Sequence, residues 1–370
     1  MRNRQFLLWA LLCCLWLPFS ASAQEFRQAP AATDSVQVSS EADIDVNELV
    51  FGHIGDAYSW PITESIQIPL PCMVKGDDGW HVFMSSRLSG GQSYEGFYLA
   101  KEGDLKGKIV MRLADGAEVR PIDLSITKDV LGLMINSAVL VALILYCSRW
   151  YRRNTVEKGA PKGLVGMMEA LVLMIYEDVI KEGIGEDYKR FTPYLLTAFF
   201  FILINNLMGL LPIFPGGANI TGNIAITLVL ALCTFLLTNL FGTKEYWKEI
   251  FWPDVPWWMK VPVPLMPVIE FFGIFTKPFA LMIRLFANIM AGHAAILSLI
   301  AIIFITVKVG AFINGTMTFM AVIFSIFMTF LEILVAFIQA YVFTMLSAVF
   351  IGLARVKHKV RNKKETYNSI

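Results

Sequence analysis

Charged residues are scarce in this chain. Only 16% of its 370 residues are Asp, Glu, Lys or Arg, and 56% are hydrophobic, against roughly 25% and 45–50% in soluble domains. The charges are also segregated, because none lies within residues 192–242, 310–330 or 334–353. Each run is long enough to cross a bilayer, which takes about 20 apolar residues. The scarcity therefore predicts a polytopic membrane protein of the all-α class, since a closed barrel has short alternating segments instead.

Other absences narrow the function. The net charge of +1 gives no overall field that would attract nucleic acid. No GxxxxGK[ST] loop for phosphates and no HExxH metal motif occurs in the sequence, and these are the patterns expected of a nucleotide-binding or metal-dependent hydrolase. We therefore predict no metal site and no cofactor.

The first 23 residues have the features of a cleavable signal peptide. Arg2 and Arg4 precede an apolar stretch that ends in Ala21-Ser22-Ala23, so cleavage is expected after Ala23. A lipid anchor at Cys14 is the rival interpretation, although its flanking residues are not small. Cleavage leaves three cysteines, which are too few for a disulfide framework or a metal cluster: Cys72, Cys147 and Cys233.

Residues 24–128 form a polar segment on the extracytoplasmic side of this scheme. Short alternating stretches such as "SIQIPL", "WHVFMS" and "KGKIVMRL" are separated by Gly and Asp turns, which predicts a small strand-rich domain or an extended arm. Its aromatic patch could bind a ligand, but packing against the membrane domain is the favoured interpretation; the patch is His53, Asp56, Tyr58 and Trp60.

Residues 129–355 form the predicted transmembrane domain, with about five crossings. The first span, about 130–146, ends in "SRWYRR", whose arginines should be cytoplasmic. The stretch from 163 to 184 predicts an amphipathic helix at the cytoplasmic face. Spans of about 192–211 and 222–242 follow, and a cytoplasmic loop with a cluster of tryptophans comes after them. Residues 356–370 form a basic cytoplasmic tail.

The last third predicts two helices of about forty residues, 263–303 and 318–354, with a turn near Asn314-Gly315. Both exceed a perpendicular span and must therefore be strongly tilted or lie partly in the membrane plane. Together they form an antiparallel hairpin.

A polar stripe follows the first of these helices. Glu270, Lys277 and Arg284 are spaced by seven residues and nearly share one face, and Asn288 lies one turn further along it. His293 lies about 180° around the helix from Arg284 and about 13 Å along it. The arginine and the histidine therefore face different surroundings.

The second helix carries Glu332 and Gln339, again seven residues apart. Residues at one depth of an antiparallel pair have a constant index sum. The sum for Arg284 and Gln339 is about 623 and that for His293 and Glu332 about 625, so one register pairs both sets. Asn288 and Gln339 alone could equally serve only to join helices by hydrogen bonds. An arginine in a span costs about 2.5–3.5 kcal/mol and needs a counter-charge or an aqueous path; its missing carboxylate is expected on another subunit.

The motif "KPFALMIRLFANIMAGH", followed by "LEILVAFIQAYVFTML", strongly resembles subunit a of the F-type ATP synthase. The segment "NNLMGLLPIFPGGANITGNIAITLVLAL" resembles the earlier spans of that family, so the likeness covers roughly residues 130–355. His293 and Glu332 stand where well-known bacterial members carry an acid and a histidine. This exchange keeps the acid–imidazole pair and swaps its ends, as mitochondrial members do.

The resemblance implies a non-catalytic, ion-translocating subunit of a bacterial inner membrane, with its mature N-terminus outside and its C-terminus in the cytoplasm. Its implied partners are a c-ring of carboxylate-bearing subunits, the peripheral stalk subunit b, the rest of the F1F0 complex and lipid. Arg284 would couple proton flow to rotation of the ring. Protons are the default ion, although sodium is not excluded.

The resemblance also implies two aqueous half-channels, with His293 and Glu332 in the outer one. Glu270 suits the inner one, though it could equally be an ordinary interfacial charge. Lys277 would support the stripe or extend to the interface, and Asn288 and Gln339 would position Arg284 or its water.

Two alternatives belong to other classes. A secondary transporter would also place polar residues within spans, but such proteins usually contain an internal repeat, and the sequence shows no second copy of the arginine hairpin. A membrane-embedded hydrolase would need a nucleophile with its base, or a third metal ligand beside His293 and Glu332.

Overall fold

The structure is a computed structural model, and it describes nine stretches of the chain: 55–63, 66–76, 78–100, 105–112, 118–154, 161–211, 216–251, 265–307 and 310–355. The predicted signal peptide, His53 and the basic tail lie outside these residues. The described chain divides into two compact units, and several helices pass from one unit into the other. One unit consists of Met1–Tyr146, Phe201–Thr227 and Leu285–Ile338; the second consists of Cys147–Phe200, Leu228–Arg284 and Gln339–Ile370.

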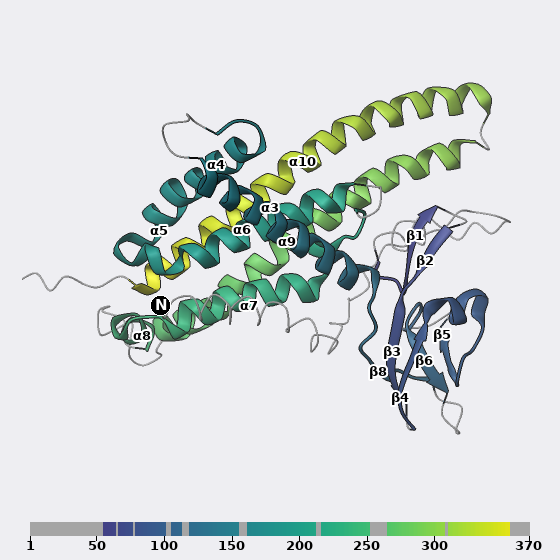
Figure 1. The fold of residues 1–370 in the computed structure, drawn as a ribbon, viewed down its shortest axis with the longest axis horizontal. Coiled ribbons are helices and arrows are strands. Elements are labelled where there is room, and N and C mark those ends of the chain that lie inside the picture. The colour runs from purple at the N-terminus through teal and green to yellow at the C-terminus, as the bar shows by residue number, and fades with distance from the viewer. Residues whose placement is uncertain are drawn as a thin grey trace, which may run out of the picture. The chain divides into compact units, whose positions relative to one another are not determined.

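The first unit begins with short strands, as the alternating stretches predict (Figure 1). A hairpin pairs β1 with β2, and two three-stranded sheets have the orders β4-β3-β8 and β5-β6-β7. All pairings in them are antiparallel. The strand bounds are β1 Ser59–Thr63, β2 Ile66–Pro69, β3 Pro71–Gly76, β4 Gly79–Met84, β5 Phe97–Leu99, β6 Ile109–Arg112, β7 Glu118–Val119 and β8 Ile122–Asp123. A 3-10 segment, η2 Ser85–Gly91, follows β4.

The aromatic patch of the strand domain is a packing feature. Tyr58 lies in a core with Cys72, Val74 and Phe97, and its hydroxyl donates a hydrogen bond to Asp123. Burial and the neighbouring Asp123 carboxylate raise the pKa of Tyr58, which keeps the phenol neutral. Trp60 is buried with Ala218 and Ile220, near the start of the membrane helices. The favoured interpretation, packing rather than ligand binding, agrees with these contacts.

The membrane part of the described chain is helical. Four helices or continuous helical runs are long and apolar enough to cross a bilayer, and a fifth span results if α7 and α8, bent by 99°, are counted together. The helices are α3 Lys128–Arg153, α4 Leu164–Met174, α5 Glu182–Ile184, α6 Tyr188–Leu210, α7 Ile224–Leu240, α8 Lys244–Phe251, α9 Leu265–Thr306 and α10 Ala311–Arg355. Helix α8 lies in the stretch that the sequence assigned to a loop.

Short irregular helices connect the longer ones. The predicted amphipathic helix is built from α4, a π-helical segment η4 Ile175–Lys181, and α5. A 3-10 turn η5, Gly185–Asp187, leads into α6, and another, η6 Ile220–Gly222, precedes α7. A π-helical turn inserts an extra residue per turn and so rotates the faces of the helix after it.

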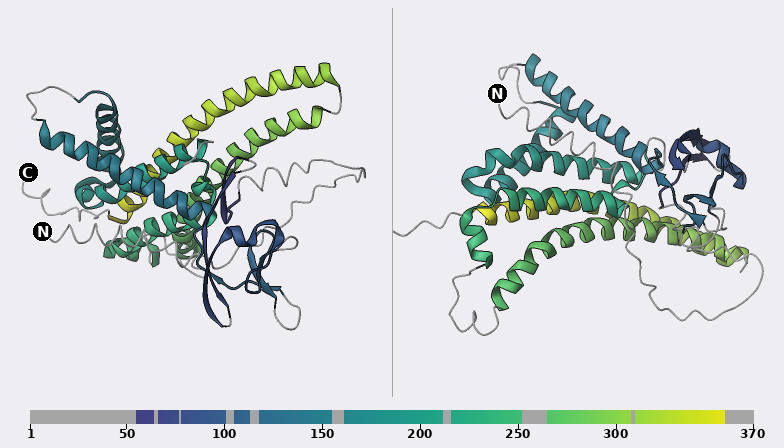
Figure 2. Two further views of the ribbon diagram at one scale, coloured as in Figure 1. Left: turned by 45° about the vertical axis from the view of Figure 1, so that its right-hand side comes forward. Right: turned by 90° about the horizontal axis from the view of Figure 1, so that it is seen from below.

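The two long C-terminal helices have 42 and 45 residues, close to the expected forty. In the first unit their halves, 285–306 and 311–338, lie antiparallel (Figure 2). The turn expected at Asn314-Gly315 is wrong, because α10 already begins at Ala311. The irregular backbone conformation lies instead at Gly310, directly before α10, where φ is 139°. Asn314 belongs to the first turn of α10, and its side chain accepts a hydrogen bond from the Thr306 hydroxyl of α9 (2.9 Å).

In the second unit, α10 crosses α5 with the backbones almost in contact. A Cβ placed on Gly352 would lie 1.9 Å from the carbonyl oxygen of Gly183. The end of α10 is also tied down, because the Arg355 guanidinium binds the Asp187 carboxylate and the Phe241 carbonyl. Glycine at 352 is therefore a requirement of the crossing.

Gly352→Ala should destabilise the protein by about 1–3 kcal/mol, the usual cost of overpacking, because the methyl group meets backbone that cannot turn away. Thermal aggregation of the detergent-purified complex measures the effect. Gly273→Ala is the matched control on α9, since a Cβ there meets nothing within 4 Å. Equal melting of both variants would contradict the tight crossing.

Candidate functional site

The polar stripe of α9 begins with an ion pair. Lys277 Nζ lies 3.8 Å from Glu270 Oε1, and both side chains are partly exposed. The two residues are seven apart and so lie two turns from each other on nearly one face. The stripe predicted from the sequence is therefore present, and its first two members neutralise each other.

Arg284 differs from Lys277 in having no acid beside it in the described part of the chain. Its side chain is exposed on α9, next to the exposed Ile283. Among the residues that the structure describes, no carboxylate lies within 4.0 Å of its guanidinium. An arginine on an apolar helix is costly without a counter-charge, so this surface calls for an acid from outside the described chain.

His293 and Glu332 are brought together, as the antiparallel register predicts. His293 Nδ1 lies 3.7 Å from Glu332 Oε1, with side-chain exposures of 20% and 5%. Glycines on both flanks make room for the pair. A Cβ on Gly292 would lie 2.6 Å from Glu332 Oε1, and one on Gly209 of α6 would lie 3.9 Å from His293 Nε2.

The Glu332 carboxyl group is buried without hydrogen bonds. Neither of its oxygens has a hydrogen-bond partner within the described part of the chain, and 3.7 Å from the imidazole is too long for a direct bond. Buried carboxyl groups normally hydrogen-bond to protein or to water. A carboxyl group and an imidazole separated in this way can exchange a proton through one intervening water.

The amides of the two helices are placed differently. Asn288 is exposed on α9, whereas Gln339 of α10 is buried, with 3% of its surface accessible. The sum that pairs His293 with Glu332 also places Gln339 near the level of Arg284. That second pairing stays a prediction.

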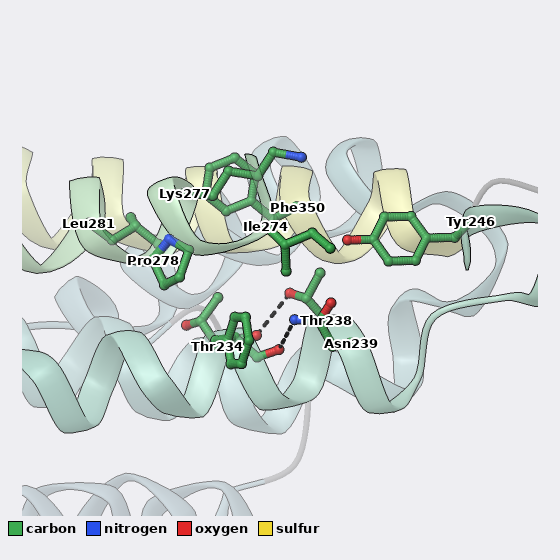
Figure 3. A pocket seen from close by; sticks show the side chains of 10 residues that line it. Thr234, Thr238, Asn239, Tyr246, Ile274, Lys277, Pro278, Leu281 and Phe350 are labelled. Carbon is green, nitrogen blue, oxygen red and sulfur yellow. Dashed lines mark hydrogen bonds between the residues drawn. The ribbon is translucent and has the colours of Figure 1, made fainter. Parts of the chain in front are cut away.

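A small pocket of about 20 Å³ lies in the second unit, and Lys277 of the stripe is among its lining residues (Figure 3). Thr234, Thr238 and Asn239 of α7 line one side, and the Asn239 Oδ1 is buried without a partner among the described residues. Lys277 of α9 lies across from them, and Tyr246 of α8 lies at one end. Most of the remaining lining is apolar: Phe235, Ile274, Pro278, Leu281 and Phe350.

Several buried amides were missed by the sequence reasoning. Asn136 Nδ2 of α3 donates to Asn205 Oδ1 of α6 (3.0 Å), and Asn206 Nδ2 donates to the Ala336 carbonyl of α10 (3.2 Å). The adjacent asparagines of the uncharged run were a usable signal, because amides in a span need partners. Their partners depend on how the helices pack.

These features define a class: a multi-pass helical membrane protein whose long C-terminal hairpin carries a buried acid–imidazole pair and an exposed arginine that pairs with no carboxylate of the described residues. The comparisons with known proteins agree with that class. Residues 133–352 match the family model "ATP synthase A chain". The chain therefore belongs to the ATP synthase A chain family.

Similar proteins include three bacterial chains named ATP synthase subunit a. The chain is 43% identical over 244 residues to that of Chloroherpeton thalassium, covering 64% of this chain and 68% of the relative. The identity is 48% over 239 residues to the chain of Chlorobium phaeobacteroides, covering 63% of this chain and 66% of the relative. It is 35% over 297 residues to that of Myxococcus xanthus, covering 78% of this chain and 88% of the relative. The chain thus spans about two thirds of the length of the first two relatives.

The strand domain lies outside the ATP synthase model. Residues 49–125 match a separate family model, described as "Domain of unknown function (DUF8433)". This match covers the strands from β1 to β8, which end just before α3. The chain therefore joins a strand domain that matches a separate family model to the family's helical part.

Gly292→Ala should separate the acid–imidazole pair without unfolding the chain. The new methyl group meets the far end of the Glu332 side chain, which can rotate away at small cost in stability. In a cryo-EM map of the complex, the Glu332 carboxyl group should move away from α9 and from His293.

The control is Gly315→Ala on α10, where a Cβ meets nothing within 4 Å. It should leave the 3.7 Å separation of the pair unchanged. An unmoved Glu332 in the Gly292→Ala protein would show that the packing around this glycine is looser than described.

Proposed function

We propose that this chain is the proton-translocating stator subunit of a membrane ATP synthase. It provides two aqueous half-channels and a fixed cation, Arg284, that together couple transmembrane proton flow to rotation of a ring of carboxylate-bearing subunits. The observation that carries the proposal is the exposed Arg284 on α9, which pairs with no carboxylate of the described residues, on the same hairpin as the buried His293–Glu332 pair.

Arg284 causes each ring carboxylate to release its proton. A nearby guanidinium lowers the pKa of a carboxylate by about 1–3, so each ring acid releases its proton as it reaches the arginine. The same charge repels a proton that would otherwise pass straight across. Gln339 and Asn288 hold the guanidinium or its water in position. Protons must therefore travel around with the ring.

His293 and Glu332 form the relay of the outer half-channel. They lie toward the extracytoplasmic end of α9, about 13 Å beyond Arg284. Imidazoles and carboxylates ordinarily titrate near pH 6.5 and 4.3, a range in which both can take up and release protons. Burial and the missing direct hydrogen bond suit an exchange through water.

Glu270 belongs to the inner half-channel. It lies about 21 Å from Arg284 toward the cytoplasm, and its partner Lys277 lines a small pocket together with Thr238 and Asn239. Lys277 holds the Glu270 carboxylate in place through their ion pair. The two paths enter from opposite faces and end at different sides of Arg284.

The assembly that this function requires comprises the c-ring, the peripheral stalk subunit b and the catalytic sector, in a bacterial inner membrane. The chain crosses that membrane five times, with its mature N-terminus outside and its C-terminus inside. A secondary transporter is the second candidate, since it too would carry polar residues within spans. It does not require an arginine whose acid lies on another subunit.

Arg284→Ala should abolish ATP-driven acidification of inverted membrane vesicles, because no fixed charge then forces ring carboxylates to release protons. Arg284→Lys tests whether charge alone suffices; we expect less than about a tenth of the flux, since an ammonium lacks the planar geometry that fits a carboxylate. Co-purification with the ring controls for assembly. Pumping that persists in an assembled Arg284→Ala complex would favour the transporter.

Glu332→Gln should slow proton flux in both directions by about 10²-fold, the usual contribution of a positioned proton-transfer group, while the complex still assembles. The amide keeps the size of the side chain but cannot carry a proton. Passive flux through membranes stripped of the catalytic sector measures the effect. Unchanged flux would remove Glu332 from the relay.

A further inference from the structure

A ladder of buried polar groups links the strand domain to the His293–Glu332 pair within the first unit. Its upper end is Asp129, in the first turn of α3, which is buried with 4% of its surface accessible. Asn223 Nδ2 of the α7 entry donates to Asp129 Oδ2 (3.1 Å). Asp129 Oδ1 has no hydrogen-bond partner among the described residues.

The strand domain covers this carboxylate from outside. The chain at Gly55–Ala57 lies over the start of α3: Lys128 Nζ donates to the Gly55 carbonyl (3.0 Å) and the Asp129 backbone N–H donates to Asp56 Oδ1 (3.1 Å). Below it, the buried Trp60 of β1 packs near Gly132, where a Cβ would lie 3.6 Å from the indole ring. A segment of the strand domain thus forms a fixed roof over Asp129.

The ladder continues along one face of α3. Asn136 lies seven residues beyond Asp129 and about 10.5 Å deeper, and both are buried on that face. Asn136 Nδ2 binds Asn205 of α6, but its own Oδ1 is buried without a partner in the described chain. Asp129 and Asn136 of α3 therefore each have a buried side-chain oxygen without a hydrogen-bond partner among the described residues.

Helix α6 carries the ladder to the relay. Asn206 donates a hydrogen bond to the Ala336 carbonyl, which lies one turn from Glu332 on α10. The Asn206 Oδ1 is buried without a hydrogen-bond partner among the described residues. Gly209, less than one turn further along α6, faces His293 Nε2.

Buried oxygens without protein partners are normally satisfied by ordered water. In the described part of the first unit, four residues on three helices share this property: Asp129, Asn136, Asn206 and Glu332. Asparagine amides do not exchange protons but can orient water, whereas a carboxylate takes a proton from hydronium and returns it to the next water. The arrangement therefore has one proton-exchanging group at each end and amides between them.

We propose that Asp129, roofed by the strand domain, is the proton-accepting carboxylate at the outer mouth of the pathway, and that Asn136 and Asn206 hold the water that connects it to Glu332. This inference rests on the proposed function. It gives the strand domain a role: its Gly55–Ala57 segment holds the start of α3, and with it Asp129, in place at the entry.

The test uses ATP synthesis by the purified complex in proteoliposomes, driven by an acid pulse on the extracytoplasmic side. Asp129→Asn should lower the initial rate at least about tenfold at mildly acidic pulses, and Asp129→Glu should restore most of it. The deficit should shrink as the pulse becomes more acidic, because hydronium then enters without a collecting carboxylate. The other charged groups near Asp129 are Asp56, Lys128 and, more distantly, Lys108.

Glu118→Gln is the matched control, because it removes an exposed carboxylate of the same domain outside the ladder. A rate for Asp129→Asn equal to that of Glu118→Gln would overturn the proposal, as would a loss of the same factor at every pH, which marks a structural role. Arg284→Ala distinguishes a failure of the proposed function from a failure of this inference. If Arg284→Ala stops synthesis while Asp129→Asn does not, the proposed function stands and this inference fails.

A second measurement covers the case in which Asp129→Asn fails to assemble. With the five native cysteines replaced by serine, Asn136→Cys should make proton flux sensitive to silver ions, which travel in water. Met134→Cys, on the exposed apolar face of α3, should stay insensitive. Insensitivity of Asn136→Cys would show that no water reaches this level and would overturn the proposal.

Discussion

The structure depends on the cost of holding a permanent positive charge within an apolar helix. Arg284 lies on the exposed face of α9, where a guanidinium costs roughly 2.5–3.5 kcal/mol without compensation. Lys277, two turns away, is compensated by Glu270 at 3.8 Å, and Glu332 lies with His293 instead. The acids near this surface within the described chain are thus already engaged. An arginine left in this state fits a surface that meets a succession of carboxylates, because a permanent partner would prevent their exchange.

The hairpin of α9 and α10 carries its polar groups at separate positions along the two helices. Its length lets one continuous pair of helices carry an ion pair at one level, the arginine at another and the acid–imidazole pair at a third. Glycines allow neighbouring groups to approach the two helices closely. Gly292 of α9 leaves room for the Glu332 carboxyl group, and Gly352 of α10 leaves room for the backbone of α5. The strand domain adds a roof above Asp129 at the start of α3. Charge placement and close packing thus act together along the same helices.

Much of this arrangement could be predicted from the sequence, for physical reasons. Uncharged runs located the long helices, and a constant index sum brought His293 to Glu332 because antiparallel helices have a single register. The turn at Asn314-Gly315 was wrong because an apolar environment favours intrahelical hydrogen bonds, so these two residues joined α10. The 99° bend into α8 and the contacts of Asn136 and Asn206 could not be predicted, since they depend on how helices distant in sequence pack. The roles of Arg284, His293, Glu332, Gln339, Asn288, Glu270 and Lys277 stay proposals.

The most direct test of the central claim is the structure of the assembled membrane sector by cryo-EM. The account predicts that the Arg284 guanidinium faces a carboxylate of the rotating ring, at charge-assisted hydrogen-bond distance or across one water, with His293 and Glu332 on the outer side of that contact. An Arg284 paired with an acid of its own chain, or with a lipid phosphate away from any ring, would contradict it.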